Sequence, residues 1–348
     1  MVNETNENLY DLLKRDSSRV YVIAEAGLNH GGSKERALAL LRAAKWAGAD
    51  AVKFQTFRAE LLASTHPAFL SHAKDQPNLQ ELFKKLELPF DAFRALFKEA
   101  KRLNIDFLST PFDEESADFL DELGVTAFKI ASGDITHRPL IEHVARKGKP
   151  VLMSTGMSTG QEIENAIDWM HTQANDQTIL LHCVSSYPAE AEELNLKSVE
   201  YLRDRFGVPV GFSDHSVGSL GSTVAVSLGA QIIERHFMVE TRGDLPDLAV
   251  SMDAKQLRTH IEELRTVGKV LGTRGKFASE AESRNKIASR RALYARRPIA
   301  LGETIDAAML YALRPAIGIS PSEMSDVVGK HAVTAIEADA PVQWELLG

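Results

Sequence analysis

The sequence predicts an α/β protein built on a (β/α)8 TIM barrel, followed by a small β-rich domain. Short apolar runs alternate with helical segments from Val20 to about Leu271, and polar residues stand at the ends of the runs. Eight runs are present: VYVIAEA, AVKFQTF, DFLST, AFKIAS, PVLMST, TILLHCV, PVGFSD and AQIIERHF. Several are continuously apolar, as are parallel strands covered on both faces. Eight repeated strand–helix units favour a closed barrel.

The segments between the runs carry the 3.6-residue period of amphipathic helices. In SKERALALLRAAKWAG, apolar residues from Ala37 to Ala47 share one face, with Ser33 as the N-cap and Gly48 as the stop. The lead-ins WAGADAVKFQ, ELGVTAFKIA and SLGAQIIERH resemble one another, which indicates weak internal repetition. A doubly wound open sheet is the alternative, but GLNHGG after the first strand is not its glycine-rich turn.

The chain divides into four parts by composition. Residues 1–19 form a polar N-terminal extension, and residues 20–271 form the barrel. Residues 272–287 are polar and basic, with few apolar residues, and are expected to be a linker. Residues 288–348 contain short strands, Gly and Pro turns and one short helix in PSEMSDVV, and a domain of this length has a thin core.

The overall composition is that of an ordinary globular protein, with 44% hydrophobic and 25% charged residues. No apolar stretch is long enough to span a bilayer, and the polar, acidic start is not a signal peptide. The net charge of −8 argues against a nucleic-acid binder but leaves room for a small anionic substrate in a locally basic site. The single cysteine, Cys183, excludes an internal disulfide, fits a cytoplasmic protein and is interpreted as a buried small hydrophobe.

Polar side chains of functional types gather at the carboxyl ends of the predicted strands, where barrel enzymes carry their chemistry. In chain order these residues are Glu25, Lys53, Gln55, Thr110, Lys129, Ser132, Asp134, Ser154, Ser185, Tyr187, Ser213, His215, Glu234 and His236. Each residue alone indicates little, since a serine at a strand end often only caps it. The repetition along the eight strands indicates a site.

Lys53 and Lys129 lie inside apolar strands, where a lysine costs desolvation energy unless it is paired. One interpretation is an ion pair with Glu25 or Glu234. The others are binding of a phosphate or carboxylate, or formation of a Schiff base. Two ammonium groups ringed by serine and threonine hydroxyls would suit a substrate that carries both anionic groups.

His215 and His236 end the last two strands, which are neighbours in a barrel, so their imidazoles can meet over the barrel mouth. Two imidazoles with open positions suit a divalent transition metal such as Mn²⁺, with water or substrate completing the coordination. A buried structural histidine at each position is the alternative.

The motifs IAEAGLNHGG, AGADAVKFQTF, FLSTPFDEES, FKIASGDITHRPL, STGMST, HCVSSYPA, GFSDHS and ERHF occur in this order and resemble the sialic acid synthase family. That family includes N-acetylneuraminate, legionaminate and pseudaminate synthases and a spore-coat polysaccharide branch. The resemblance runs from about Val20 to the end, where RRALYARRPIALGETI and LRPAIGISP are similar to the family's antifreeze-like (SAF) domain. Members condense phosphoenolpyruvate (PEP) with an N-acylated amino sugar. The resemblance implies a metal-dependent, C–C bond-forming transferase acting on N-acetylmannosamine or a related 6-deoxy diacetamido hexose.

Carried over by position, the resemblance implies three groups of site residues. His215 and His236 would hold the metal, Mn²⁺ in preference to Mg²⁺ or Co²⁺. The phosphate and carboxylate of PEP would be bound by Lys53, Thr110, Lys129, Ser132, Ser154, Ser185 and Ser213. The sugar and the reacting carbons would be surrounded by Glu25, Gln55, Asp134, Tyr187, Glu234 and Asp247, of which Glu25, Glu234 and Asp134 are the candidate catalytic groups. Arg314 would reach the barrel mouth of a partner subunit, which implies a homodimer that exchanges its small domains.

Four positions depart from the family pattern, all in or near the expected sugar half of the site. Asp134 stands where Glu is usual, Leu245 replaces a usual Gly, Met238 replaces a frequent Thr, and NHGG replaces the commoner NHNG. The resemblance therefore leaves the acceptor sugar open.

Other interpretations also stay open. A Schiff-base aldolase would use Lys53 or Lys129 as its nucleophile. The PEP-dependent heptulosonate and octulosonate synthases share the barrel and the reaction type, but they use phosphorylated sugars and lack the SAF tail. A degenerate barrel would instead serve as a scaffold in polysaccharide biosynthesis, with the SAF-like domain as an interaction module.

Overall fold

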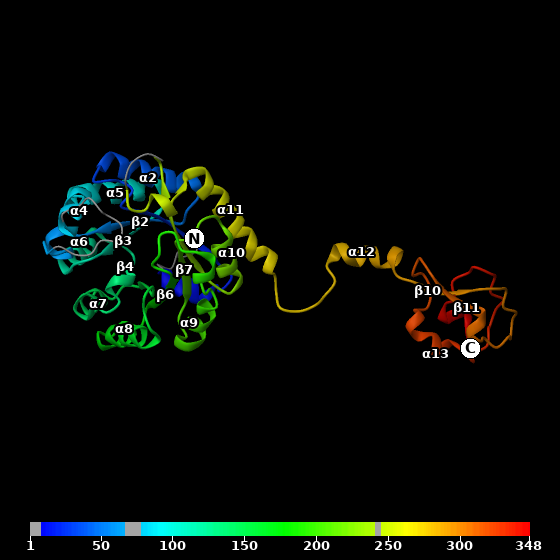
Figure 1. Ribbon diagram of the computed structural model, residues 1–348. Helices are drawn as coiled ribbons and strands as arrows, with labels where there is room; N and C mark the ends of the chain where they lie inside the picture. The colour runs from blue at the N-terminus through cyan, green and yellow to red at the C-terminus, as the bar shows by residue number, and fades with distance from the viewer. Residues whose placement is uncertain (1–7, 67–77, 241–244) are drawn as a thin grey trace, which may run out of the picture. The chain divides into compact units, whose positions relative to one another are not determined.

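The computed structural model describes residues 8–66, 78–240 and 245–348. The chain forms two compact units, Met1–Gly272 and Thr273–Gly348, and each is described by itself (Figure 1). The first seven residues of the predicted 1–19 extension lie outside the described residues. None of the helices in the described part of the chain is both long and apolar enough to cross a membrane.

Parallel strands form the wall of the first unit as a near-closed barrel (Figure 1). The strands are β1 (Tyr21–Gly27), β2 (Ala51–Thr56), β3 (Asp106–Pro111), β4 (Phe128–Ile130), β5 (Val151–Ser154), β6 (Thr178–Cys183), β7 (Val210–Asp214) and β8 (Ile232–Met238). Hydrogen bonds join them in the order β3-β2-β1-β8-β7-β6-β5-β4, and β3 and β4 at the ends of this path contact each other. A short strand, β9 (Met252–Asp253), pairs with β8 off this path. The predicted (β/α)8 barrel is confirmed.

Helices alternate with the strands and cover the outside of the barrel. They are α2 (Lys34–Ala47), α3 (Ala59–Leu62), α4 (Leu79–Leu86), α5 (Phe90–Leu103), α6 (Glu114–Leu123), α7 (Arg138–Ala145), α8 (Gly160–Thr172), α9 (Ser198–Phe206), α10 (Leu220–Ser227) and α11 (Ala254–Leu271). Helix α2 begins and ends as predicted. The Ser33 side chain accepts a hydrogen bond from the Arg36 N–H, and Gly48 ends the helix in the left-handed region at φ +87°.

The barrel interior changes from apolar at the bottom to polar at the top within single strands. Side chains two residues apart share a face of a strand, so Ile23 and Glu25 of β1 both face inward. The same holds for Ile232 and Glu234 of β8. The lower layer is an apolar cluster that includes Ile23, Ala51, Leu108, Leu152, Ile179, Leu181 and Ile232. This layer supports the polar groups above it and keeps water from reaching them from below.

Helix α1 (Leu9–Arg15) belongs to the barrel, although composition alone marks residues 1–19 as a polar extension. Leu13 is 1% exposed and packs into the lower apolar layer of the barrel. The Gln231 Nε2 donates to the Leu13 carbonyl at 2.7 Å, which ties the helix to the residue that precedes β8. The helix therefore closes the bottom of the barrel.

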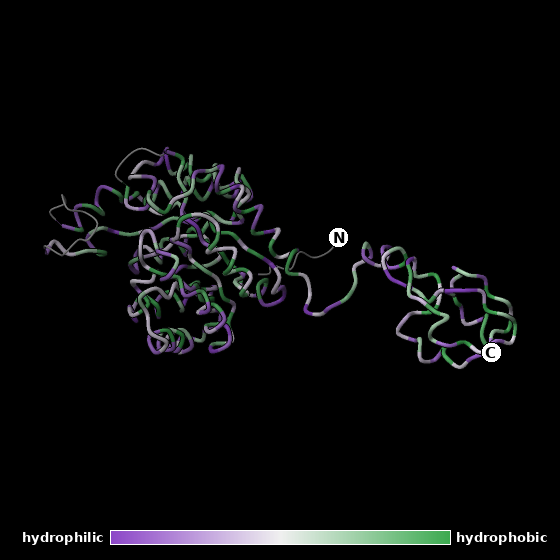
Figure 2. The backbone as a smooth tube through the Cα atoms, turned by 45° about the vertical axis from the view of Figure 1, so that its right-hand side comes forward, coloured by the Kyte–Doolittle hydropathy of each residue, from purple (hydrophilic) through white to green (hydrophobic). Residues whose placement is uncertain are grey.

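The second unit is a small β fold with its own core. Strand β10 (Ala292–Ala295) pairs antiparallel with β11 (Leu310–Leu313), and isolated bridges join further segments. Apolar residues, interspersed with polar ones along this unit (Figure 2), meet in a cluster that includes Leu293, Ile299, Ile305, Leu310, Val327 and Val342. The predicted short helix in PSEMSDVV is present as α13 (Met324–Val327).

The segment predicted as a linker is partly helical. Helix α12 (Glu280–Ser289) begins at a capping box, in which Ser279 and Glu282 bond to each other's backbone N–H groups. None of its residues is buried. The absence of an apolar stripe explains why hydrophobic periodicity does not reveal this helix.

Candidate active site

A cavity of about 260 Å³ opens at the carboxyl ends of the barrel strands. Fourteen of the sixteen predicted site residues line it: Glu25, Lys53, Gln55, Thr110, Lys129, Ser132, Ser154, Ser185, Tyr187, Ser213, His215, Glu234, His236 and Asp247. Asp134 and Arg314 are absent from this lining. Five further lining residues were not predicted as site residues: Phe112, Ala131, Gly133, Met157 and Cys183.

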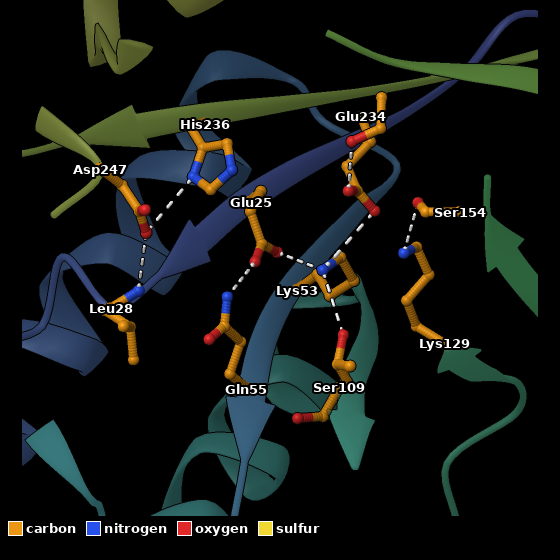
Figure 3. Close-up of polar contacts among 12 residues, drawn as sticks. Glu25, Leu28, Lys53, Gln55, Ser109, Lys129, Ser154, Glu234, His236 and Asp247 are labelled. Carbon is orange, nitrogen blue, oxygen red and sulfur yellow. Dashed lines mark hydrogen bonds and ion pairs between the residues drawn. The ribbon is translucent and has the colours of Figure 1, made fainter. Parts of the chain in front are cut away.

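Lys53 lies between two buried carboxylates (Figure 3). Its Nζ is 2.8 Å from Glu25 Oε2 and 3.6 Å from Glu234 Oε2, and it donates to Thr110 Oγ1 at 3.3 Å. The parallel register of β1 and β2 sets Glu25 opposite Lys53, which explains the first contact. The ion-pair interpretation of Lys53 from the sequence is thus correct, and it involves both carboxylates.

Burial and the surrounding charges shift the pKa values of Glu25 and Glu234 in opposite directions. Burial raises the pKa of Glu25, Lys53 opposes this rise, and the charge of Glu234 adds to it. Burial would also raise the pKa of Glu234, but Lys53 and Lys129 together hold it below its usual value. Burial lowers the pKa of Lys53, but the charges of Glu234 and Glu25 more than offset burial and the net pKa is raised. Lys53 therefore remains an ammonium ion.

Lys129 has no such counterion in the part of the chain that the structure describes. Its Nζ donates to Ser154 Oγ at 2.7 Å (Figure 3) and to the Ile130 carbonyl at 3.0 Å. Within the described ranges no carboxylate forms an ion pair with it. Its side chain is 3% exposed. Burial lowers the pKa of Lys129, with the charge of Glu234 opposing this effect and that of Lys53 adding to it. A buried ammonium with only neutral partners is costly, and an anion in the cavity would remove that cost.

Serine hydroxyl groups line the cavity near the two lysines. Ser213 Oγ donates to Glu234 Oε1 at 2.8 Å, and Ser132 Oγ accepts from the Gly156 N–H at 3.1 Å. A Cβ at Gly156 would collide with the hydroxyls of Ser185 and Ser132, so only glycine lets this loop approach them so closely.

His215 and His236 meet as the sequence predicted, with ring centroids 5.4 Å apart. His215 Nδ1 lies 2.8 Å from the Val184 carbonyl, and the Tyr187 ring stacks on His215 at 4.2 Å. His236 Nδ1 lies 3.5 Å from Asp247 Oδ2. The Val184 carbonyl thus orients the His215 ring through its Nδ1, whereas His236 Nδ1 faces Asp247 without a hydrogen bond to any described residue.

This arrangement fits a metal ligand pair. A carbonyl that accepts from His215 Nδ1–H leaves Nε2 with its lone pair, the form that binds a metal. Burial lowers the pKa of His236, which keeps that ring neutral although Asp247 opposes the effect. In the part of the chain that the structure describes, no three His, Cys, Asp or Glu side chains cluster as a metal site. The two imidazoles would thus be the protein's donors, and substrate or water would complete the coordination.

Asp134 and Arg314 stand apart from these residues. Asp134 closes the 3₁₀ turn Ser132–Asp134, and its buried Oδ2 has no hydrogen-bond partner among the described residues. Burial raises the pKa of Asp134, against the charges of His137 and Lys129. Arg314 belongs to the second unit and is exposed.

The unpredicted lining residues are mainly apolar. Phe112 directly follows β3 and joins an apolar cluster with Leu28, Phe57 and Leu245. Met157 is 75% exposed at the cavity rim. Cys183 is 5% exposed, as its interpretation as a small buried residue requires, and its Sγ lies 3.6 Å from His215 Nδ1. The position of Phe112 at a strand end was the signal that could have identified it.

His30, in the loop after β1, is expected to make the fold sensitive to acid. Its Nδ1 accepts from the Gly32 N–H at 3.1 Å, so the ring proton sits on Nε2. Burial lowers the pKa of His30 from 6.5 to about 4, against the charge of Asp247. Between these pH values the unfolded chain binds a proton that the folded chain does not. The free energy of unfolding should therefore fall as pH falls, by on the order of 3 kcal/mol below pH 4.

Urea denaturation across this pH window measures the effect. The His30→Gln variant should lose this part of the pH dependence, whereas the half-exposed His171→Gln variant should keep it. Identical pH slopes for the wild type and His30→Gln would contradict the prediction.

A cavity lined by lysines, carboxylates and histidines at the carboxyl ends of barrel strands is typical of a barrel enzyme. Residues 40–276 match the model of the NeuB family and residues 290–348 that of the SAF domain, and the chain belongs to the NeuB family. An N,N'-diacetyllegionaminic acid synthase of Legionella pneumophila is 39% identical over 350 residues, covering 98% of both chains. A pseudaminic acid synthase of Campylobacter jejuni is 33% identical over 323 residues, covering 92% of this chain and 94% of the relative.

A solved structure of an N-acetylneuraminic acid synthetase from Leptospira borgpetersenii, in complex with citrate, is also similar. Its sequence is 34% identical, its TM-score is 0.69, and the match covers 77% of this chain and 90% of that chain. These three relatives are named as synthases of N,N'-diacetyllegionaminic, pseudaminic and N-acetylneuraminic acid.

Proposed function

We propose that the protein condenses PEP with an N-acylated amino sugar to form a sialic-acid-like nine-carbon keto acid and phosphate. The observation that carries the proposal is the buried Lys129 ammonium, which has no carboxylate partner among the described residues and lines the cavity together with Lys53 and several hydroxyl groups. An anion bound beside Lys129 would neutralise its buried charge, and PEP carries two anionic groups, a phosphate and a carboxylate. Membership of the NeuB family supports the same reaction class.

In the proposed reaction, C3 of PEP attacks the aldehyde carbon of the open-chain sugar, water adds to C2, and phosphate leaves. Lys129 and the hydroxyls of Ser154 and Ser132 hold the anionic enol phosphate in line with the sugar, which supplies both orientation and charge stabilisation. Lys53 keeps Glu25 and Glu234 in place. Either carboxylate can orient the attacking water and accept its proton.

A divalent metal is the proposed cofactor, Mn²⁺ first and Mg²⁺ or Co²⁺ as alternatives. His215 and His236 would hold it, and when bound it would polarise the aldehyde oxygen as a Lewis acid. Tyr187 and Asp247 would orient the two rings, because Tyr187 stacks on His215 and Asp247 faces His236 Nδ1.

For the acceptor we propose a 6-deoxy diacetamido hexose over N-acetylmannosamine. Identity is higher to the diacetyllegionaminic acid synthase than to the N-acetylneuraminic acid synthetase, at 39% against 34%. Phe112, Met157 and Tyr187 give the cavity an apolar wall, which suits acyl methyl groups. Asp134 directly follows the lining residues Ser132 and Gly133, and its Oδ2 has no hydrogen-bond partner among the described residues, so Asp134 is the proposed specificity position.

Phosphate release from PEP tests the proposal. The full chain with Mn²⁺ should release phosphate with 2,4-diacetamido-2,4,6-trideoxymannose, more slowly with N-acetylmannosamine, and not with phosphorylated pentoses or tetroses. Removing the metal with a chelator should abolish release, and Mn²⁺ should restore it. No turnover with any acylamino sugar would overturn the proposed function.

Two other functions give different results in simple experiments. A Schiff-base aldolase would use Lys129, since Lys53 is held as an ammonium ion by two carboxylates. Borohydride would then trap a pyruvate adduct, and chelators would have no effect. A scaffold would bind neither PEP nor Mn²⁺ in calorimetric titrations of the metal-free protein.

The proposal extends to a cytoplasmic homodimer in which Arg314 of the partner subunit contacts the acylamino group. The SAF match over residues 290–348, the exposure of Arg314 and the lone cysteine support it. Sedimentation should give a dimer, and mixing Arg314→Ala chains with chains inactivated at Lys129 should restore part of the activity. Failure of any mixture to exceed the separate variants would contradict the exchange.

A further inference from the structure

A second cavity, of about 430 Å³, lies on the outer side of β8. We call it the outer cavity. It is lined by the loop before α10, the segment that leads into β9, and the first half of α11. Arg235 contributes to it from β8, where its neighbours Glu234 and His236 line the strand-end cavity. Because successive side chains of a strand point to opposite faces, the two cavities are separated by the barrel wall.

Three buried polar atoms, on two residues that line the outer cavity, have no hydrogen-bond partner among the described residues. They are Nε of Arg235 and both ring nitrogens of His260 on α11. Arg235 is 1% exposed and His260 is 2% exposed. Leaving a buried donor or acceptor unpaired is costly, so such groups are nearly always bonded to protein, water or a ligand. Three of them in one cavity point to something that occupies it.

The outer cavity carries no net charge. The Arg235 guanidinium lies 2.9 Å from Asp214 Oδ1, and its terminal nitrogens also donate to the carbonyls of Asp214 and Ser216. Burial lowers the pKa of His260 to about 4, so one ring nitrogen donates and the other accepts at neutral pH. Lys255 and Glu263 contribute one charge of each sign to the lining. An anion or a cation would therefore find no unmatched partner here.

We propose that the outer cavity is a second binding site, which takes an uncharged small molecule bearing hydroxyl and amide groups, of the class of an N-acylated sugar. A hydroxyl group can accept from Arg235 Nε–H and donate to the free acceptor nitrogen of His260. The walls contributed by Val217, Val250 and Met252 suit an acyl methyl group or the apolar face of a sugar ring. The cavity volume falls within the range of small-molecule sites, roughly 300–1,000 Å³.

Calorimetric titration of the full chain with N-acetylmannosamine tests this site, with inorganic phosphate as the charged comparison. His260→Leu removes both ring nitrogens. Thr259→Trp fills the cavity from an exposed position of α11, and Lys269→Trp is the matched control on the same helix outside the cavity. Both cavity variants should weaken sugar binding at one class of sites about tenfold or more, His260→Leu by removing the hydrogen bonds of the ring and Thr259→Trp by occupying the cavity volume. The control should bind like the wild type, and phosphate should not bind at this site.

Equal sugar binding in the wild type and both cavity variants would overturn the proposal, since the cavity would then hold only water or be covered by another copy of the chain. Loss of phosphate binding in the variants would overturn the assignment of an uncharged ligand. Phosphate release from PEP should be unchanged in both cavity variants. Sugar binding that depends on His260 in a protein without PEP turnover would support this site and refute the proposed function alone, so the two failures are distinguishable.

Discussion

Replacing Lys129 by methionine is expected to lower kcat/KM for phosphate release about a hundredfold to a thousandfold, as loss of a charge-stabilising donor does. The fold should not suffer. Among the described residues, the partners of the buried ammonium are two neutral groups, the Ser154 hydroxyl and the Ile130 carbonyl. Methionine is of similar length and needs no counterion, so the cost of burying an unpaired charge disappears. The free energy of unfolding should stay the same or rise.

Steady-state kinetics with PEP and urea denaturation of the same protein measure the two effects. Lys98→Met is the matched control, because Lys98 is an exposed lysine on α5, far in sequence from the strand ends. This control should change neither quantity. A Lys129→Met protein that releases phosphate at the wild-type rate would exclude Lys129 from binding PEP. A strongly destabilised variant would mean that the ammonium has a counterion in the free protein.

Replacing Lys53 by methionine should have the opposite effect on stability. Glu25 and Glu234 would remain buried, with their shared cation removed from 2.8 Å and 3.6 Å. Breaking a buried ion pair by removing one partner costs about 3–5 kcal/mol. The variant is therefore expected to lose activity and, with it, much of the free energy of unfolding of a typical domain, which is about 5–15 kcal/mol.

Neutralising the carboxylates separates this cause from simple loss of packing. Adding Glu25→Gln and Glu234→Gln to Lys53→Met should restore most of the lost stability, because no buried charge is then left unpaired. Activity should stay low in the triple variant. If the triple variant is as unstable as Lys53→Met alone, packing rather than charge holds this part of the barrel together.

The sequence alone predicted the barrel and most of the candidate site because both depend on short-range regularities. Eight apolar runs of strand length specify the strands, and residues two apart on one strand share a face. Polar side chains at the carboxyl ends of different strands therefore meet at one end of the barrel, and this can be predicted from the positions of the strands alone. Lys53, Lys129, His215 and His236 are examples, all of them in the cavity lining.

Other features depend on contacts that local patterns do not encode. Helix α1 closes the bottom of the barrel because Leu13 packs against residues of strands that lie far from it in the sequence. Helix α12 forms from its cap without an apolar stripe. Asp134 follows a cavity-lining serine and glycine, yet the turn of the backbone there takes it out of the lining. Turn geometry of this kind depends on atoms outside the segment itself.

The register of strand β8 is tightly constrained, because consecutive residues of this strand line two different cavities. Glu234 and His236 contribute to one, and Arg235 to the other. A one-residue slip in the pairing of β8 with β7 or β1 would exchange their surroundings. The guanidinium would then enter the strand-end cavity, and the imidazole and the carboxylate would face the surrounding helices. An insertion or deletion in β8 would thus disrupt both cavities, even where the barrel itself still folded.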